Sequence, residues 1–457
     1  MPTEDQELRL PTDSRVSRRR FLGGGAAGLA ALGLGPLLAA CGDSDGDSSS
    51  ATTAAGASAT TAAAAAGSGD IPSIKIGVVT PRTGPLAPFG ETDAFVLDQM
   101  RAELGDAVEI VDVDAESDSA RAAEVAQELI LNDGVNLVLV GGTPDMTVPV
   151  VAQCDLNEIP CISTVAPWQP HYLGTGGELG PDVTPGVASV WNHHFFWGLE
   201  DIIQVFIELW EQSGAAKVVG ALWPNDPDGN AWGDPNVGFP PALEAAGFTV
   251  VDPGRFELST TDFTAQINAF RDAGVEIVTG VVPPPVFGNV QAQMLQQGFN
   301  PPVVTVGKAL LFSSAVATFP QPEGLSSEIW WTDRHPFASS LTGQSAAELA
   351  GAFTEATDNT WEQPLGFVHA MFEIAIDAAK LAGSADAGPL NDAIGATNLS
   401  TVVGTIDFAS GPVPGVAKTP LTAGQWGAGA DDGFELAVNI NSQLPDLPTD
   451  GTITPIS

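Results

Sequence analysis

The side chains that most often carry out chemistry are few in this chain, and they form no common catalytic or metal-binding pattern. No histidine has a cysteine, aspartate or glutamate partner at zinc-ligand spacing. The histidines are His171, His193, His194, His335 and His369. The strand-to-helix turns contain neither a G-x-S-x-G nucleophile elbow nor a G-x-x-x-x-G-K-[ST] phosphate loop. None of these patterns calls for catalysis, so we expect no enzyme activity, no metal and no other cofactor.

The cysteines allow two interpretations. Cys154 and Cys161 are seven residues apart across a predicted helix-to-strand junction. An exported protein could form a disulfide there, but two such positions are hard to bring within bonding distance. Two buried free thiols are the preferred interpretation, and the disulfide remains the alternative.

The chain is strongly acidic, with 56 acidic and 16 basic residues and a formal net charge of −40 at pH 7. Nucleic acids and anionic membrane surfaces repel such a polyanion. We therefore expect no nucleic-acid partner, and no membrane contact beyond a covalent anchor.

The N-terminus has the pattern of an export signal. Arg18–Leu22 is basic, and an apolar stretch rich in glycine and alanine continues to Ala40. The paired arginines resemble the twin-arginine signal, and Leu38–Gly42 resembles a bacterial lipobox, which implies lipidation of Cys41. A membrane-spanning anchor is the alternative, but the glycines and Pro36 favour cleavage.

Residues 1–40 are therefore predicted to be a signal peptide. Gly42–Gly69 has no large apolar residue and cannot bury a core. We expect residues 41–72 to form a disordered tether that holds an extracytoplasmic protein, lipid-anchored through Cys41, on the membrane.

The folded part is expected to start at Ile74–Val79, an apolar run of strand length rich in β-branched residues. Thr80–Pro85 follows and contains turn residues that cannot continue a strand. In open α/β sheets, ligands bind beyond the carboxyl ends of the strands. This loop is therefore the first predicted wall of a binding cleft.

Short apolar runs then alternate with helical patterns. The predicted strands are 108–113, 135–140, 159–163, 216–223, 248–251, 276–282 and 302–306. The predicted helices are 91–104, 118–131, 146–156, 192–210, 240–246, 263–273, 290–297 and 367–380. Asp145 is expected to cap the helix at 146–156. Alternation of this kind is typical of parallel sheets, and its restart near residue 216 predicts two of them.

Several stretches resemble the type I solute-binding proteins of ABC importers, the branched-chain amino-acid-binding or leucine-binding-protein-like family. Thr83–Gly90 resembles the TGPxAxxG loop after the family's first strand, and Leu222–Gly229 resembles its LYPNDPYG turn. Thr261–Ile267 resembles a TDFSAQL helix start, Val403–Phe408 a GxIxF strand, and Gly424–Trp426 a GQW motif.

The resemblance implies an α/β fold of two lobes, each a parallel sheet flanked by helices, with the ligand cleft between them. Lobe I would comprise residues 73–192 and 333–420, and lobe II residues 193–332 and 421–457. A folded part of this length commonly divides into more than one domain.

The resemblance also implies positions for ligand-binding residues. Phe89 matches an aromatic residue of the first loop, and Asp228 stands where the family has a tyrosine. The second and third loops match at 143–147 and 165–168. The residues carried over from these two loops are Thr143, Asp145, Met146, Thr147, Ala166 and Trp168.

This chain departs from the family where amino acids are bound. Pro144 and Pro167 replace residues with hydroxyl groups, and a proline offers no backbone N–H either. Lys308 stands near the place of the acid that pairs with an α-ammonium, whereas Asp228 adds a carboxylate. These departures argue against a plain leucine-type ligand.

Tryptophans are enriched near the predicted strand ends and suit an apolar, aromatic or cationic ligand. They are Trp168, Trp223, Trp232, Trp330 and Trp331. Trp168 and Trp232 are the predicted binding residues among them, although packing in the core is an equal alternative for most. Trp191, Trp197 and Trp210 are expected to pack along the predicted helix at 192–210.

The predicted function is that of an extracytoplasmic solute-binding lipoprotein of an ABC transporter. It would bind a small organic solute, an amino acid or a related compound, between its lobes and deliver it to an ABC permease. A sensory lipoprotein of the same fold is the alternative, and an enzyme on this scaffold is the least favoured.

Overall fold

The computed structural model describes residues 69–180, 183–429 and 433–456, which all belong to one compact unit. The predicted signal peptide, Cys41 and nearly all of the predicted tether lie outside the described residues. Within the described ranges, every helix is too short or too polar to span a membrane.

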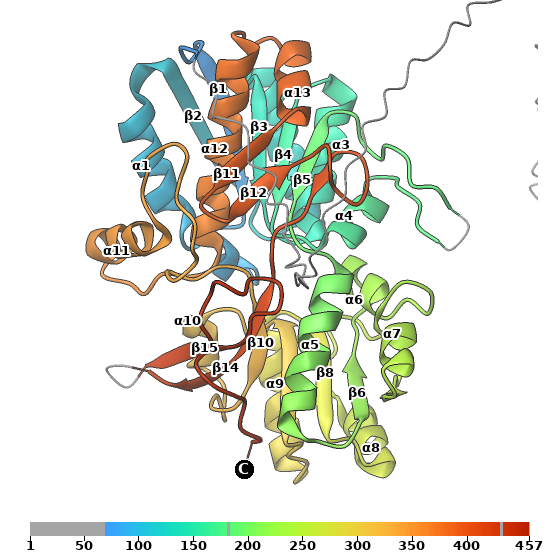
Figure 1. The fold of residues 1–457 in the computed structure, drawn as a ribbon. Helices are drawn as coiled ribbons and strands as arrows, with labels where there is room; N and C mark the ends of the chain where they lie inside the picture. Colours follow the sequence, from blue (N-terminus) through green and yellow to red (C-terminus); the bar gives the residue numbers. More distant parts are fainter. Residues whose placement is uncertain (1–68, 181–182, 430–432, 457) are drawn as a thin grey trace, which may run out of the picture. The chain divides into compact units, whose positions relative to one another are not determined.

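The first sheet is parallel throughout and has the strand order β13-β5-β4-β3-β1-β2 (Figure 1). Its central strands are apolar and buried, as strands covered on both faces must be. The bounds are β1 Ile74–Thr80, β2 Val108–Asp114, β3 Leu137–Gly141, β4 Cys161–Thr164, β5 Asn192–Phe195 and β13 Val416–Ala417.

Helices cover this sheet, and α12 is buried along most of its length against α1, β3 and β4. The helices of this domain are α1 Asp93–Leu104, α2 Ser119–Glu128, α3 Pro144–Asn157, α4 Trp168–Gly174, α11 Ala346–Thr357, α12 Pro364–Ala382 and α13 Ala387–Gly395. The hairpin of β11 (Asn398–Thr401) and β12 (Gly404–Asp407) lies next to α12. Cys154 and Cys161 are buried free thiols in this domain.

The second sheet has the order β15-β14-β10-β9-β8-β6-β7. It is parallel from β7 to β10, and β14 and β15 extend it in the antiparallel direction. The bounds are β6 Val218–Leu222, β7 Thr249–Val251, β8 Ile277–Val282, β9 Val303–Lys308, β10 Ser326–Ile329, β14 Thr422–Ala428 and β15 Phe434–Ile440.

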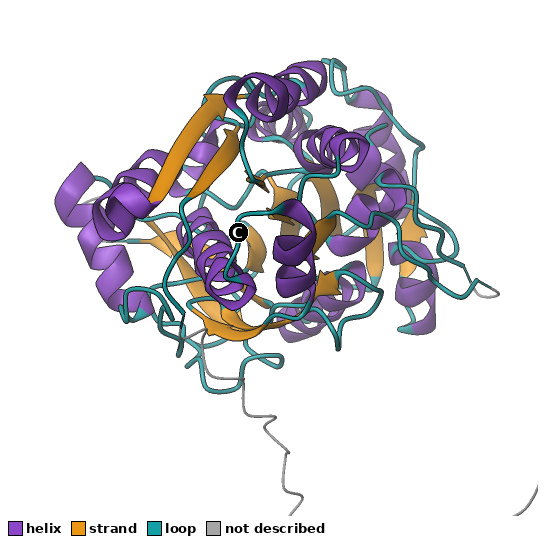
Figure 2. Cartoon of the chain, turned by 90° about the horizontal axis from the view of Figure 1, so that it is seen from above, coloured by secondary structure: helices purple, strands orange, loops and turns teal. Residues whose placement is uncertain are grey.

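Helices also pack against the second sheet, and Figure 2 shows the strands of the molecule lying among helices. The helix α5 packs on β9, β10 and β14. The helices of this domain are α5 Leu199–Ser213, α6 Pro227–Trp232, α7 Phe239–Ala245, α8 Thr264–Ala273, α9 Pro284–Gln296 and α10 Ser313–Val316. The α/β fold with two domains, which the sequence predicted, is confirmed.

The chain crosses between the domains after β5, after β10 and after β13. The prediction of a helix over 192–210 is wrong for its first part. Asn192–Phe195 is instead the strand β5, because it pairs in parallel with both β4 and β13. The predicted lobe boundary between residues 192 and 193 therefore cuts a strand, and the first crossing follows Phe195.

A buried hydrogen bond ties α5 to the strand that leads to the cleft. The indole N–H of Trp210 donates to Thr305 Oγ1 at 3.0 Å, and both residues are buried. The directly adjacent strand carries Thr279 opposite Thr305. Thr279 is equally buried, but its hydroxyl has no hydrogen-bond partner within the described part of the chain.

These two threonines make a matched pair for a stability test. We expect Thr305→Val to lower the free energy of unfolding by about 1–3 kcal/mol, because the buried indole N–H of Trp210 loses its acceptor and the hydrogen bond of 2.7 Å between Thr305 Oγ1 and Ser326 Oγ is lost. We expect Thr279→Val not to lower it, because that change removes a hydroxyl without a partner. Urea unfolding of both variants measures the difference, and equal losses would contradict the importance of the hydrogen bonds of the Thr305 hydroxyl.

Candidate functional site

A buried cavity lies where the strand ends of the two sheets meet. Its lining residues end or follow β1, β3, β4 and β5 of the first sheet and β6, β8, β9 and β10 of the second. The volume is about 20 Å³, which is room for about one water molecule. The lining residues are Phe89, Thr143, Val165, Pro167, Phe196, Trp197, Asp228, Trp232, Val281, Lys308, Leu311, Glu328 and Trp330.

Two lining residues have a left-handed backbone although neither is glycine. Val165, just after β4, has a φ of 69°, and Lys308, at the end of β9, has a φ of 63°. Such a conformation costs about 1–3 kcal/mol, and it is rare for a β-branched residue such as valine. Strain of this kind persists where the surrounding structure holds it in place, as it does at binding sites.

An ion-pair cluster forms the centre of the wall from the second domain. Lys308 Nζ lies 2.5 Å from Asp228 Oδ2 and 3.3 Å from Asp226 Oδ2. Asp226 is also the N-cap of α6, where its Oδ1 accepts a hydrogen bond from the Gly229 N–H at 2.6 Å. All three charged side chains are buried, and Asp228 is only 1% exposed.

Asp228 is the least satisfied member of this cluster. Apart from the ion pair with Lys308, neither of its oxygens accepts a well-aligned hydrogen bond from the described residues. Burial raises the pKa of Asp228 to about 6, although Lys308 opposes the rise. Burial alone would lower the pKa of Lys308, but the attraction of Asp226 and Asp228 is larger and raises it. Asp228 therefore has acceptor capacity for a donor group of an occupant.

Two more acids lie close to this cluster. Glu328 lines the cavity, and burial raises its pKa to about 7, although the Ser327 hydroxyl donates a hydrogen bond to it at 2.7 Å. Burial also raises the pKa of Asp145, while Lys308 lowers it. Because several acids surround one lysine, the net charge of the site is negative above pH 7.

Aromatic rings with unused donors complete the wall. The rings of Phe89 and Trp330 are stacked, with centroids 6.3 Å apart. The indole N–H groups of Trp197, Trp232 and Trp330 have no hydrogen-bond partner among the described residues, and neither has the Thr143 hydroxyl. Each such buried group costs about 1–3 kcal/mol when it is left unpaired. The cavity thus presents donors and apolar surface together, the usual composition of a small-molecule site.

The sequence matches the model of a family described as periplasmic binding protein over residues 73–431. The chain belongs to this family. It is 27% identical over 234 residues to the Leu/Ile/Val-binding protein homolog 6 of Brucella abortus strain 2308. This match covers 48% of the chain and 54% of the relative, so the chain spans about half the length of the curated relatives it matches.

Solved structures of periplasmic binding proteins share the fold. A leucine-binding protein, LivK, of Thermotoga maritima has a TM-score of 0.65 and 18% identity, covering 81% of this chain and 99% of its own. A solute-binding protein of an ABC transporter from Rhodopseudomonas palustris, in complex with 3,4-dihydroxybenzoic acid, has a TM-score of 0.64 and 18% identity. That match covers 80% of this chain and 96% of the other.

The ligand-binding residues predicted from the sequence of this periplasmic binding protein divide into two groups. The residues that line the cavity are Phe89, Thr143, Asp228 and Trp232. The predicted residues outside its lining are Asp145, Met146, Thr147, Ala166 and Trp168. The binding role of every one of them stays a prediction.

Thr147 and Ala166 face the interior of the first domain. Thr147 Oγ1 is 2.9 Å from His171 Nδ1, and the Ala166 carbonyl accepts a hydrogen bond from His194 Nε2 at 2.8 Å. The two imidazoles are stacked 4.0 Å apart, and burial lowers the pKa of both. This neutral histidine pair holds the loops behind the cavity without lining it.

Asp145 does not cap the helix, and this prediction is wrong. Proline suits the first helical position because it needs no N–H partner there. The helix α3 therefore starts at Pro144, with Thr143 as N-cap and Asp145 within the first turn. Met146 belongs to the hydrophobic core. The Trp168 indole N–H donates to Glu200 Oε1 at 3.1 Å, outside the cavity.

Sequence patterns pointed only weakly to several lining residues. Trp197 was assigned to a helix, although it follows a strand end. Trp330 is one of two adjacent tryptophans near a strand end, and the pattern does not say which one faces the cavity. Lys308 attracted notice only because it stands near the position where the resembled family has an acid. Glu328 lies within the short strand β10, and no sequence motif marks it. The arrangement of strand ends brings these residues together.

The buried lysine gives a stability test of the cluster. We expect Lys308→Met to lower the free energy of unfolding by about 3–5 kcal/mol at pH 8, because it leaves buried carboxylates without a counter-charge. The loss should be smaller at pH 5, because the raised pKa of Asp228 lets that carboxyl gain a proton.

Lys217 is the matched control, because it forms a partly exposed pair with Glu211 at 2.7 Å. Lys217→Met should change stability by no more than about 1 kcal/mol at either pH. Urea unfolding at both pH values measures the two variants. A pH-independent loss for Lys308→Met would contradict the coupling to Asp228.

Proposed function

We propose that this protein is the extracytoplasmic solute-binding lipoprotein of an ABC transporter. It binds a small organic solute, an amino acid or a related compound, between its two domains and delivers it to a permease. The observation that carries this proposal is the buried cavity at the strand ends of both sheets, with unpartnered donors and the unsatisfied carboxylate of Asp228. Nothing in the lining suggests a catalytic arrangement of nucleophile and base.

Solute entry requires the domains to separate. The cavity of about 20 Å³ is far smaller than the roughly 300–1,000 Å³ of typical ligand sites. The three chain crossings can act as a hinge, so that the domains open to admit the solute and close around it.

The residues around the cavity support the proposal that the solute differs from a simple aliphatic amino acid. Pro167 lines the cavity and Pro144 begins α3, so neither supplies a backbone N–H for a carboxylate. The unpaired indole N–H groups can donate to oxygen atoms of the solute, and Asp228 can accept from a donor group. The rings of Phe89, Phe196 and the tryptophans favour an apolar or aromatic body.

A solute screen tests the proposed binding function. We expect the chain from Asp70 onward to be stabilised by at least one member of a panel of branched-chain and aromatic amino acids, amides, polyamines and aromatic carboxylates. A ligand at roughly 100 times its Kd adds about 2.7 kcal/mol to the free energy of unfolding, which thermal unfolding detects easily.

Trp330→Phe, which removes one unpaired indole N–H, should reduce the shift, whereas Trp191→Phe outside the cavity should leave it unchanged. A shift with leucine or valine alone would contradict the proposed change of specificity. No shift with any solute would contradict the transport proposal and favour a sensory role.

Lipid anchoring is tested through the cysteines. We expect the full-length protein, expressed in a bacterium with lipoprotein processing, to incorporate labelled palmitate and sediment with membranes. Cys41→Ser should abolish both, because it removes the only proposed acceptor of the lipid. Cys161→Ser, which alters a buried thiol, is the matched control and should keep both. Membrane sedimentation of Cys41→Ser would instead support an uncleaved spanning anchor.

A further inference from the structure

A second cavity lies beside the crossing that follows β10. Its volume is about 610 Å³, within the roughly 300–1,000 Å³ of typical ligand pockets. Its walls come from this crossing, α10, the loop before α12 and the hairpin of β14 and β15. Leu311 is the one lining residue that it shares with the cavity at the strand ends.

Trp331, Trp361 and Trp426 contribute indole rings to the wall, and the N–H groups of Trp331 and Trp426 are already used elsewhere. The Trp331 N–H donates to the Val402 carbonyl at 3.1 Å, and the Trp426 N–H donates to the Leu310 carbonyl at 2.8 Å. Trp361 is half-buried and packs edge-to-face on Trp331, with centroids 5.5 Å apart. Trp331 and Trp426 are almost completely buried, so Trp361 is the indole that offers ring surface to an occupant. Ring faces attract apolar groups and cations.

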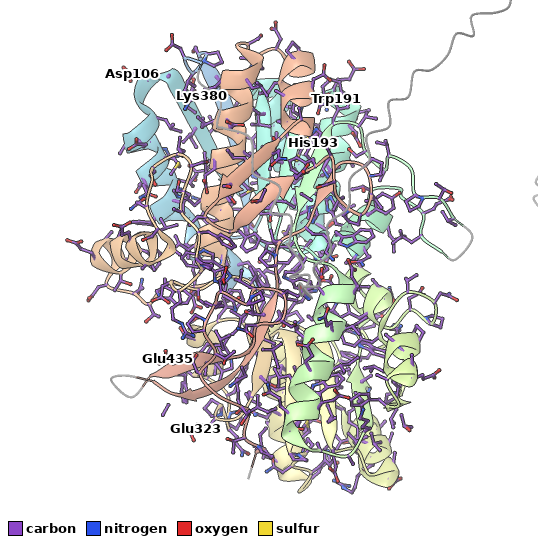
Figure 3. All side chains as sticks on the ribbon, in the orientation of Figure 1. Asp106, Trp191, His193, Glu323, Lys380 and Glu435 are labelled. Carbon is purple, nitrogen blue, oxygen red and sulfur yellow. The ribbon has the colours of Figure 1, made fainter. Side chains whose placement is uncertain are left out.

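The charged side chains of the lining are mostly acidic. They include Asp333, Glu362 and Glu435, and Figure 3 shows Glu435 on the hairpin of β14 and β15. Arg334 is the single basic residue of the described lining. Both of its terminal nitrogens bind the carboxylate of Asp450, at 2.8 and 2.6 Å. Because Arg334 is paired with Asp450, the carboxylates of Asp333 and Glu435 leave the lining with an excess of negative charge that a cation would balance.

Glu362 contributes a carboxyl group that is almost completely buried. It is 5% exposed, and its Oε1 accepts hydrogen bonds from the Ser313 N–H at 2.9 Å and hydroxyl at 2.6 Å. Burial raises the pKa of Glu362 to about 8, and the nearby Glu91 adds to the rise. At neutral pH this carboxyl therefore holds a proton, which an adjacent cation would displace.

We propose that this cavity is a second ligand site, which binds a small organic cation: an amine or quaternary ammonium with an apolar or aromatic body. The indole surface of Trp361, which packs on the buried Trp331, holds the body and the cationic head, and the acidic lining balances its charge. This site shares only Leu311 with the solute cavity among the described lining residues, so its occupant can be tested separately from the transported solute.

Isothermal titration calorimetry of the chain from Asp70 onward with benzyltrimethylammonium tests the proposal. Phenylacetate and benzyl alcohol serve as anionic and neutral aromatic controls. We expect the cation to bind at least tenfold more tightly than either control. Binding should also release a proton from Glu362, seen as a heat that changes with the ionisation enthalpy of the buffer.

Variants locate the binding. Trp361→Ala should weaken binding at least tenfold, and Trp191→Ala, an indole of the first domain outside this lining, should leave it unchanged (Figure 3). Glu362→Gln should retain a cooperative thermal transition and abolish the proton release. Asp228→Asn, in the solute cavity, should have no effect on either readout.

Three results would overturn the proposal: equal affinity for the cation and its controls, no binding at all, or binding that Asp228→Asn abolishes and Trp361→Ala does not. The last result would place the cation in the solute cavity. Because Trp361 lies outside the solute cavity, Trp361→Ala should still respond to the solute panel. Failure of this inference is thereby distinguished from failure of the proposed transport function.

Discussion

The ion pair of Lys308 with Asp228 and Asp226 is the interaction on which the cavity at the strand ends depends. A buried lysine is tolerated only when it is paired, and its two partners come from the first turns of α6. The same residue ends β9 in a left-handed conformation, so its position follows from both charge and backbone geometry. Asp226 is also engaged as a helix cap, which leaves Asp228 as the member whose carboxylate has unused acceptor capacity, as the proposed function requires.

Parallel strand order explains why this cluster faces the aromatic wall. Every strand of the first sheet points its carboxyl end the same way, and so do β6, β8, β9 and β10 of the second. Loops far apart in the chain therefore meet at one place, where ligands of such sheets bind. Several polar groups at the cavity have no hydrogen-bond partner among the described residues, whereas the core around it is apolar. The free-energy cost of these unpaired groups is expected where a site is shaped to hold an occupant.

Much of the fold could be predicted from sequence patterns, because secondary structure depends largely on residues that are close together in the chain. Ile74–Val79 reads as a buried strand from its own composition, and it is β1 in the structure. The same reasoning failed at Asn192–Phe195, a short polar and aromatic segment that is a strand only because β4 and β13 lie on either side of it. It also failed at Asp145, where the preference of proline for the first helical position moved the helix start.

The sequence by itself determined the α/β class and the presence of two sheets. Leu222–Gly229 and similar motifs indicated the protein family. The sequence also placed Phe89, Thr143 and Asp228 near strand ends. Only the tertiary structure decided that Lys308 pairs with Asp228, that Trp197 and Trp330 join the same wall, and that Trp361 lies against Trp331 beside a chain crossing. The physical reason is that periodicity and turn chemistry act between neighbours in the chain, whereas these contacts arise from strand order and domain packing, which bring distant residues together.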